Sequence, residues 1–518
     1  MKGILKLMLV ALLVITIVTA FARIPNTQAA SQVDINDAIE LGLQYLNNTQ
    51  AADGSWGGGY YPVACTAMAV LAFENAPQAH LPDNMSDPYH TTVAKGLDYL
   101  FTQAHVQTLA VQTAGDPDTN GNGKGIYFST SDTVYQTPMV LMAMVGSQNQ
   151  SRVPTTAPAA TDPYVNGRSY HDIVVDIIDW IAWAQVDAST GVYRGGWRYE
   201  ANYGSSDNSN TQWPVLGLLT AQLWGINAPG FVKSELKYWL AYSQNLGGNY
   251  NSNSLYGSFG YADKTTFNSV AESSTGILGL TYCGVSKTNA NITAAQGYLV
   301  RDWLVSSSWN TNFGNLYGMY AVMKACRLAQ PTPIEFIVNY TGSPTIEWYN
   351  GTNQYADWLV TNQQPDGHWN GGTATTNAHL NTAFGVLILE FVPVKVQWNL
   401  TVHVVDDSTN NPIPGANVMA VGPESRAGIT DGGKVDFLKL QAGPYTVTAS
   451  IAGYDTGSVF LDLSADTEIT IRLKSSAAAP VGGFEAPFNT LAMLAPWILL
   501  ALATSLGAIV AAKRRRKY

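Results

Sequence analysis

The chain has little charge and little cysteine for its length. Of 518 residues only 12% are charged, and the formal net charge is -10. Because no basic stripe occurs between the termini, nucleic acid is not an expected partner. The three cysteines, Cys65, Cys283 and Cys326, lie in apolar runs without CxxC or paired histidine spacing. This argues against a disulfide framework and against a zinc site, and we expect small buried residues instead.

The amino-terminal segment has the pattern of an export signal. Lys2 and Lys6 precede an apolar run over residues 7–20, and Ala20 and Ala22 follow in the A-x-A spacing of a cleavage site. This predicts a signal peptide over residues 1–22. An uncleaved anchor helix is the alternative, but the apolar run is short for a bilayer span. Either interpretation exports the chain.

The carboxyl-terminal segment predicts a membrane anchor. Residues 491–512 contain no charge, and five consecutive basic residues follow at 513–517. A buried core helix seldom lacks a polar face and then carries such a cluster, so we expect a transmembrane helix at 491–512 with a cytoplasmic tail at 513–518. The expected product is a single-pass cell-membrane protein with its ectodomain outside the cell. Seven Asn-x-Ser/Thr sequons agree with an extracellular glycoprotein. They begin at Asn47, Asn84, Asn149, Asn291, Asn339, Asn350 and Asn399.

An internal repeat fills the first two thirds of the chain. Its clearest copies are Gln50-Ala-Ala-Asp-Gly54-Ser-Trp56 and Gln363-Gln-Pro-Asp-Gly367-His-Trp369, each separated from a preceding aromatic by four residues. Altered copies bring the count to six units. They are centred on Gly125-Ile-Tyr127, Gly195-Gly-Trp197, Gly257-Ser-Phe259 and Trp309. Because this feature recurs around the chain, we expect the Gln and Gly-x-Trp residues to be structural.

Each repeat is followed by an apolar helix rich in small residues, which begins near Thr66, Thr137, Trp213, Thr275, Tyr317 or Thr382. A helix that is apolar on all sides must be buried, so the second helices of the units should form an inner ring inside the amphipathic first helices. Pro138 and Pro214 are expected in the first turn of their helices, where a missing N–H costs nothing.

The repeat resembles that of the squalene cyclase and protein prenyltransferase superfamily. The resemblance implies an all-α (α/α)6 toroid over residues 35–392. It does not fix an activity, because such toroids include cyclases, prenyltransferases, glycosidases and silent domains. The Asp-x-Asp-Asp acid cluster of the cyclases, the Asp-x-Cys of the prenyltransferase zinc site and the Cys-Gly-Glu-Gln thioester are all absent from this sequence.

From Trp398 the hydrophobic period changes to two, and Pro/Gly/Asp-rich turns separate the apolar runs. This predicts a small antiparallel β-sandwich at 397–474. Its turns, among them Pro412-Ile-Pro-Gly and Leu440-Gln-Ala-Gly-Pro-Tyr, resemble the carboxypeptidase regulatory-like (transthyretin-like) module, which implies a stalk or adhesion unit. Residues 475–490 are predicted to be a flexible linker rich in Ser, Ala and Pro.

Polar residues just before the inner helices are the weak catalytic candidates. These are Asp132, Asp207, Glu272 and His379. In related toroids this rim faces the central cavity, where such groups can act as acid, base or ligand. Helix capping is the alternative, since Asp is favoured at helix starts. The candidate ligand-binding residues are aromatics that could stack on a sugar or an isoprenoid, although packing is the alternative for each. They are Tyr60, Tyr61, Tyr135, Trp213 and Tyr317.

One loop has the alternating oxygen ligands of a calcium site. Asp116, Asp118, Asn120 and Asn122 alternate, with Gly121 at the sharp turn, but Tyr127 stands where a bidentate Glu belongs. Calcium and a plain surface loop therefore both remain open.

The leading hypothesis is a non-catalytic surface protein that binds carbohydrate or protein. The alternative is an extracellular enzyme on the same scaffold, most plausibly acting on polysaccharide, with a terpenoid cyclase ranked last.

Overall fold

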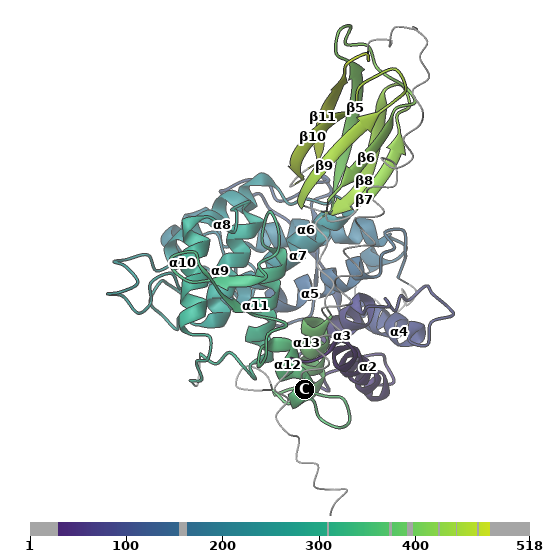
Figure 1. Ribbon diagram of the computed structural model, residues 1–518. Coiled ribbons are helices and arrows are strands. Elements are labelled where there is room, and N and C mark those ends of the chain that lie inside the picture. The colour runs from purple at the N-terminus through teal and green to yellow at the C-terminus, as the bar shows by residue number, and fades with distance from the viewer. Residues whose placement is uncertain are drawn as a thin grey trace, which may run out of the picture.

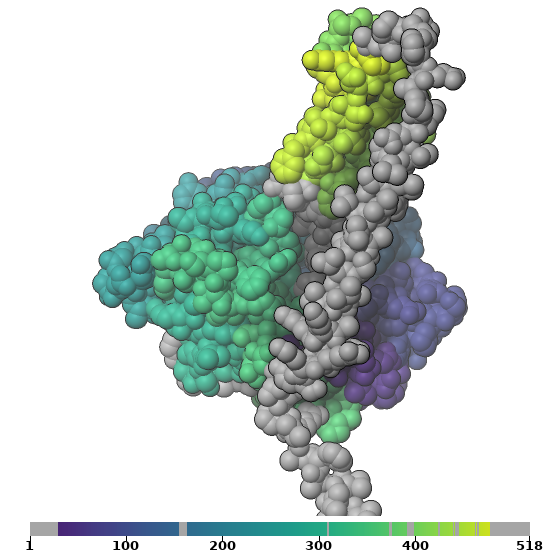
Figure 2. Space-filling model, viewed as in Figure 1, coloured from purple at the N-terminus to yellow at the C-terminus, as the bar shows by residue number. Residues whose placement is uncertain are grey.

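The computed structural model describes residues 29–154, 163–307, 310–371, 376–390, 397–422, 425–441, 443–463 and 466–476. The predicted signal peptide, transmembrane helix and basic tail lie outside these residues, as does most of the predicted linker. Within the described ranges, no helix has both the length and the apolar character that a bilayer span requires. The described chain forms a helical amino-terminal body and a carboxyl-terminal β-sheet domain, each with its own hydrophobic core (Figures 1 and 2).

Six helix pairs make up the helical body (Figure 1). The first helices of the pairs are α2 (Gln32–Thr49), α4 (His90–Phe101), α6 (Tyr170–Ala184), α8 (Gly230–Ser243), α10 (Ala290–Arg301) and α12 (Tyr355–Asn362). The second helices are α3 (Pro62–Asn75), α5 (Thr133–Gly146), α7 (Asn208–Ala221), α9 (Val270–Tyr282), α11 (Leu316–Leu328) and α13 (Ala378–Leu389). The second helices are buried almost all round, whereas the first helices keep an exposed face. The expected division into inner and outer helices is therefore confirmed.

The inner helices contact one another in cyclic order. Each packs against the next along the chain, and α13 returns to pack against α3, so the ring is closed. Residues far apart in sequence also meet at this closure: the α13 cap Asn377 donates through Nδ2 to the Gly57 carbonyl just before α3, at 3.1 Å.

The repeated glutamine joins neighbouring units. Gln50 Nε2 donates to the carbonyl of Gly54 in its own turn and to that of Thr92 in the next outer helix. Gln185 and Gln244 make the corresponding pairs of bonds. Gln363 bonds to Gly367 and then, across the closure, to the Ala38 carbonyl of α2 at 2.8 Å. The structural role predicted for these glutamines is confirmed.

The Gly-x-Trp turns pack closely against outer helices, both that of their own unit and that of the next. Trp56 and Trp369 are buried, and their indole N–H groups donate to the carbonyls of Leu46 and Leu359. Gly367 has φ 97°, and a Cβ there would overlap the Leu41 carbonyl oxygen of α2. The turn therefore requires glycine both for its backbone angle and for the close approach of the next unit.

Three details of the helical body differ from expectation. Pro138 and Pro214 are the sixth and seventh residues of α5 and α7, because these helices begin about a turn earlier than the apolar pattern does. Two connections form hairpins, β1 (Ala104–Thr108) with β2 (Lys124–Phe128) and β3 (Phe336–Val338) with β4 (Pro344–Glu347), so the body is not all-α. The third detail concerns the turn of the second unit, which was predicted at Gly125-Ile-Tyr127. There the backbone N–H of Phe128, and not that of Tyr127, donates to Thr137 of the inner helix α5.

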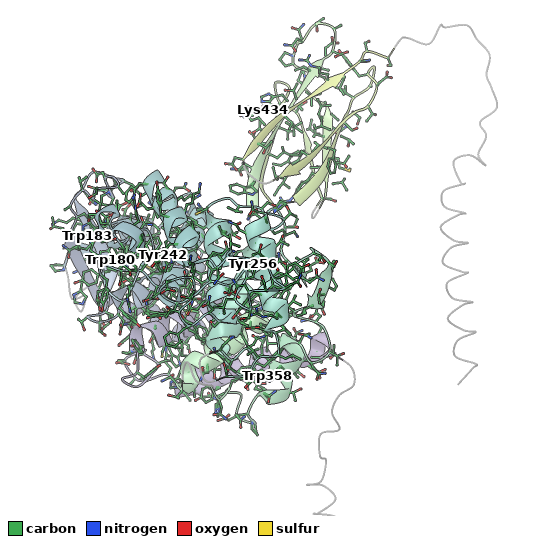
Figure 3. The ribbon with its side chains drawn as sticks, turned by 90° about the vertical axis from the view of Figure 1, so that its left-hand side faces the viewer. Trp180, Trp183, Tyr242, Tyr256, Trp358 and Lys434 are labelled. Carbon is green, nitrogen blue, oxygen red and sulfur yellow. The ribbon has the colours of Figure 1, made fainter. Side chains whose placement is uncertain are left out.

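The β-sheet domain consists of two sheets around the second core. The strands are β5 (Gln397–Asp406), β6 (Asn417–Val421), β7 (Ser425–Ile429), β8 (Lys434–Gln441), β9 (Gly443–Ser450), β10 (Gly457–Leu463) and β11 (Thr467–Leu473). One sheet has the order β10-β9-β6-β7 and the other β11-β5-β8. The sandwich is not wholly antiparallel, because β11 pairs parallel with β5. Lys434 marks β8 in Figure 3.

Candidate functional site

We use the name mouth for the part of the ring where amino-terminal ends of inner helices meet. Hydrogen bonds join these ends from helix to helix. The Tyr61 hydroxyl at the start of α3 donates to Asp132 at the start of α5 (2.9 Å), and the Tyr135 hydroxyl of α5 pairs with the Ser209 hydroxyl of α7 (2.7 Å). The Tyr317 hydroxyl of α11 donates to the Ser209 carbonyl at 2.7 Å. Residues from α5, α7 and α11 therefore meet at Ser209.

A set of polar residues around Ser209 forms what we call the mouth cluster. Its members are Tyr135, Asp207, Ser209, Gln212, Glu272 and Tyr317. Ser209 Oγ donates to Asp207 Oδ1 at 2.9 Å, and the Gln212 amide nitrogen donates to the Tyr317 hydroxyl. Tyr135, Ser209 and Tyr317 are half-buried, whereas Asp207, Gln212 and Glu272 are buried. The cluster therefore presents tyrosine and serine groups to solvent above buried carboxyl and amide groups.

Asp207 caps α7, as the structural alternative predicted. Its Oδ1 accepts the Asn210 backbone N–H at 2.7 Å, and Arg198 Nε lies 3.3 Å from its Oδ2. Burial raises the pKa of Asp207, while the Asn210 amide, Ser209 and Arg198 oppose that rise because they favour the ionised carboxylate.

Glu272 is the least compensated group at the mouth. It is the third residue of α9, and its Oε2 is buried without a hydrogen-bond partner among the described residues. Burial raises its pKa well above the usual range, and the negative charge of Asp207 raises it further. Burial at this position therefore favours the protonated form of Glu272. The Gln212 Oε1 atom is likewise buried without a partner in the described chain.

Aromatic rings fill the centre of the ring next to this cluster. Trp213 of α7 is fully buried, and it stacks on Tyr320 of α11 (centroids 5.9 Å apart, planes at 15°) and on Phe384 of α13 (6.1 Å, 21°). These contacts link helices on different sides of the ring. Trp213, predicted to line a cavity, is thus packed against other rings, so a ligand would reach the half-buried tyrosines before it reached Trp213.

The other predicted residues lie elsewhere along the mouth. Asp132 occupies the cap position of α5 with φ 47°, but its carboxylate makes no cap bond. Glu200 contacts this helix start and accepts the Asp132 N–H and the Thr133 hydroxyl, each at 2.6 Å. Helix capping, the alternative considered for Asp132, is therefore not its role in the structure. Tyr60 and Tyr61 are each 38% exposed, with their rings perpendicular and 5.0 Å apart.

His379 belongs to the closure between α13 and α3. It is the second residue of α13, and its Nδ1 accepts the Gly57 N–H at 3.3 Å. Burial lowers the pKa of His379, so the ring is neutral at neutral pH and free to accept this bond. Its imidazole lies 5.9 Å from the Tyr45 ring. No contact joins His379 to the mouth cluster within the described residues, so only Asp207 and Glu272 of the four catalytic candidates are brought together.

Three further residues at the mouth were not predicted from the sequence. Arg198 lies over the rings of Tyr199 and Tyr261, 5.5 and 5.7 Å from their centroids, and the two tyrosine hydroxyls are 2.7 Å apart. Tyr199 and Tyr261 each stand two residues after the aromatic of a repeat turn, Trp197 or Phe259. That fixed offset is the signal that could have located them.

The predicted calcium loop lies away from the mouth, in the segment that leads into β2. Of its residues Asp116, Asp118, Asn120 and Asn122, the two asparagines contact α6, where their side-chain amides donate to Asp176. The described chain contains no group of three or more His, Cys, Asp or Glu placed to hold a metal ion. The three cysteines are free, and Cys65 and Cys326 are buried.

Comparison with known proteins identifies the β-sheet domain. A family model, the carboxypeptidase regulatory-like domain, matches residues 399–474, so this part of the chain belongs to that family, as predicted. No curated protein matches the chain. Among solved structures, it has likenesses to the Bacillus anthracis TIE protein (TM-score 0.14, 14% identity, 15% of this chain and 16% of that one) and to Hormoconis resinae glucoamylase (TM-score 0.34, 12% identity, 88% and 99%). TM-scores this low support no conclusion about this chain.

Proposed function

We propose that this chain is an exported surface protein, anchored by residues 491–512, whose helical ring binds a carbohydrate at its mouth. The observation that carries the proposal is the convergence of half-buried tyrosine and serine hydroxyls above buried carboxyl and amide oxygens that lack partners. Buried polar groups are normally satisfied, so the Oε2 of Glu272 and the Oε1 of Gln212 call for a polar ligand or ordered water. Sugars offer many hydroxyls, together with C–H faces that pack on tyrosine rings.

The proposed family of the ring is the squalene cyclase and prenyltransferase-like toroid. Six helix pairs, the cyclic order of the inner helices and the Gln and Gly-x-Trp joints support this assignment. Cyclase and prenyl-transfer chemistry is not part of the proposal, because the sequence has neither the Asp-x-Asp-Asp cluster nor the Asp-x-Cys of those enzymes. The β-sheet domain would hold the ring away from the membrane.

The binding proposal is tested by titrating the purified protein with a panel of oligosaccharides and following tryptophan fluorescence. Tyr135→Phe and Tyr317→Phe each remove one hydroxyl at the mouth and keep the aromatic ring of the side chain. We expect each to weaken binding roughly five- to tenfold, the equivalent of about one hydrogen bond. Tyr340→Phe is the control, since that hydroxyl bonds the Tyr256 carbonyl away from the mouth. No binding to any sugar, or equal losses in all three variants, would refute the proposal.

A glycoside-cleaving enzyme is the second candidate. Glu272 is a buried carboxyl whose pKa is raised, and it lies near the hydrogen-bonded Asp207, an environment that suits a general acid next to a second carboxylate. Release of reducing ends from polysaccharide, lost in Glu272→Gln while sugar binding survives, would establish this function. If the wild-type protein binds sugar without cleaving it, the binding function stands alone.

The proposed topology has its own test. Protease added to intact cells should remove the helical ring, because the predicted signal peptide and basic tail would place it outside. Full protection of the ring in intact cells, with digestion after lysis, would refute the extracellular location.

A further inference from the structure

The connection between β1 and β2 folds against α6 and brings two buried acids to a loop of oxygen-bearing side chains. Trp180 and Trp183 mark α6 in Figure 3. Thr119 Oγ1 donates to Asp179 Oδ1 at 2.7 Å, and the side-chain amides of Asn120 and Asn122 donate to Asp176 Oδ1 at 2.8 and 2.9 Å. The loop and the helix turn are thus in direct contact.

Asp179 provides the observation that points to a missing cation. Its side chain is fully buried, and its Oδ2 has no hydrogen-bond partner in the described chain. The carboxylates of Asp118 and Asp176 lie near enough for their negative charges to act on Asp179. Arg168 pairs with Asp176, but no described cation pairs with Asp118 or Asp179. Buried carboxylates are normally paired with a cation or bound to a metal. Because Asp179 has no such partner in the described chain, it lacks a counter-charge.

The loop is wound around Asp118. Its carboxylate accepts the backbone N–H groups of Gly121 (2.8 Å) and Gly123 (2.6 Å), and Gly123 has φ 67°. Counted from Asp118, residues 118–123 read D-x-N-x-N-G, the order of an oxygen-ligand calcium loop with glycine sixth. The twelfth residue is then Ser129, so the loop lacks its own acidic closing ligand. Asp179 of α6, which accepts the Thr119 hydroxyl of this loop, is the acidic residue that could supply that ligand.

We propose that residues 118–124 and the facing turn of α6 bind one calcium ion, with Asp118, Asn120, Asn122 and Asp179 as side-chain ligands. Asp176 is a positioning residue, because it holds both asparagine amides and is itself neutralised by Arg168. Calcium is favoured over softer metals because every donor is oxygen, and over magnesium because the ligands come from a loop and a separate helix that need not form a regular octahedron. The ion would fasten the second repeat unit to the third.

The test uses the full-length purified protein, with calcium chloride at about 1 mM against a chelator, near the affinity of extracellular modules. Calcium should raise the melting temperature of the wild-type protein, because the ion binds only the folded loop. Terbium should replace calcium and luminesce by transfer from Tyr164, whose hydroxyl contacts Asn122 (3.1 Å) and Asp176 (3.0 Å).

Two variants and one control separate this site from others. Asp118→Asn and Asp179→Asn should each lower calcium affinity more than about tenfold. Without calcium, Asp179→Asn should melt no lower than the wild type, since it removes an uncompensated buried acid and keeps its shape. Asp263→Asn is the control, because Asp263 also holds a turn, through Thr265 and Thr266, but elsewhere in the ring. An absent calcium effect, an equal effect of magnesium, or unchanged calcium affinity in both site variants would overturn the proposal.

Discussion

Closure of the ring at its last repeat turn can be tested with one added methyl group. Gly367 lies in the turn of the sixth unit, and the Cβ of an alanine there would overlap the Leu41 carbonyl oxygen of α2 in the first unit. Because Leu41 belongs to the helix backbone, it cannot rotate away, so Gly367→Ala should force this joint apart.

The magnitude follows from what the joint contains. Opening it breaks the Gln363 to Ala38 hydrogen bond, worth about 1 kcal/mol. It also loosens Trp369, whose complete truncation would cost about 3 to 5 kcal/mol. The positive φ adds about 1 to 3 kcal/mol of backbone strain for any non-glycine residue. Gly59→Ala isolates that last contribution, since Gly59 has φ 94° and no atom within 4 Å of the added Cβ.

We therefore expect Gly367→Ala to lower the free energy of unfolding by about 2 to 4 kcal/mol more than Gly59→Ala does. Urea unfolding followed by tryptophan fluorescence measures this difference, because nearly all tryptophans lie in the helical body. Equal unfolding midpoints for the two variants would show that the last turn does not pack on the first helix. The cyclic arrangement would then be wrong.

Three more outcomes follow from the same contacts. Trp56→Ala and Trp369→Ala should each lower the free energy of unfolding by about 3 to 5 kcal/mol. A double-mutant cycle followed by thermal melting should be non-additive, because either change opens the same helical ring. Additive losses would indicate an open solenoid. Burial raises the pKa of Glu74 well above its ordinary value, so the folded protein holds a proton that the unfolded chain releases. Stability should therefore fall as pH rises from about 4.5 toward the folded pKa, by at most about 1.4 kcal/mol per unit, and Glu74→Gln should remove this slope in urea titrations; unchanged slopes would contradict it. In the β-sheet domain, hydrogen bonds from Ser408, Thr409 and Tyr454 hold the pKa of Asp406 low. Asp406→Asn should therefore lower the melting temperature of that domain, measured by calorimetry at neutral pH. An unchanged melting temperature would refute this role.

The repeat pattern was enough to predict the architecture of the helical body. Trp56 and Trp369 marked the turns, and the runs after them marked inner helices, because both patterns depend on local periodicity and burial. Helix starts were less accurate: Pro138 and Pro214 lie deeper in their helices than predicted, since each helix begins about a turn before its apolar run.

The candidate site could be predicted only in part. Asp207 and Glu272 were identified by their position before inner helices, and both lie in the mouth cluster. Asp132 and His379 have the same local signature but different neighbours, Tyr61 and Glu200 in one case and Gly57 in the other. Local sequence specifies that a polar residue begins a helix, but the packing of neighbouring units decides what that residue contacts.

The sequence by itself determined the repeat, the inner and outer helices and the β-sheet domain, because each follows from the spacing of apolar, glycine and aromatic residues along a short stretch. Only the tertiary structure decided that Gln363 meets Ala38, that Trp213 packs on Tyr320 and Phe384, and that Asp179 faces the loop at Asp118. Each of these contacts joins residues 61 to 325 positions apart. Such distances along the chain are bridged only when the ring closes and every joint packs at once.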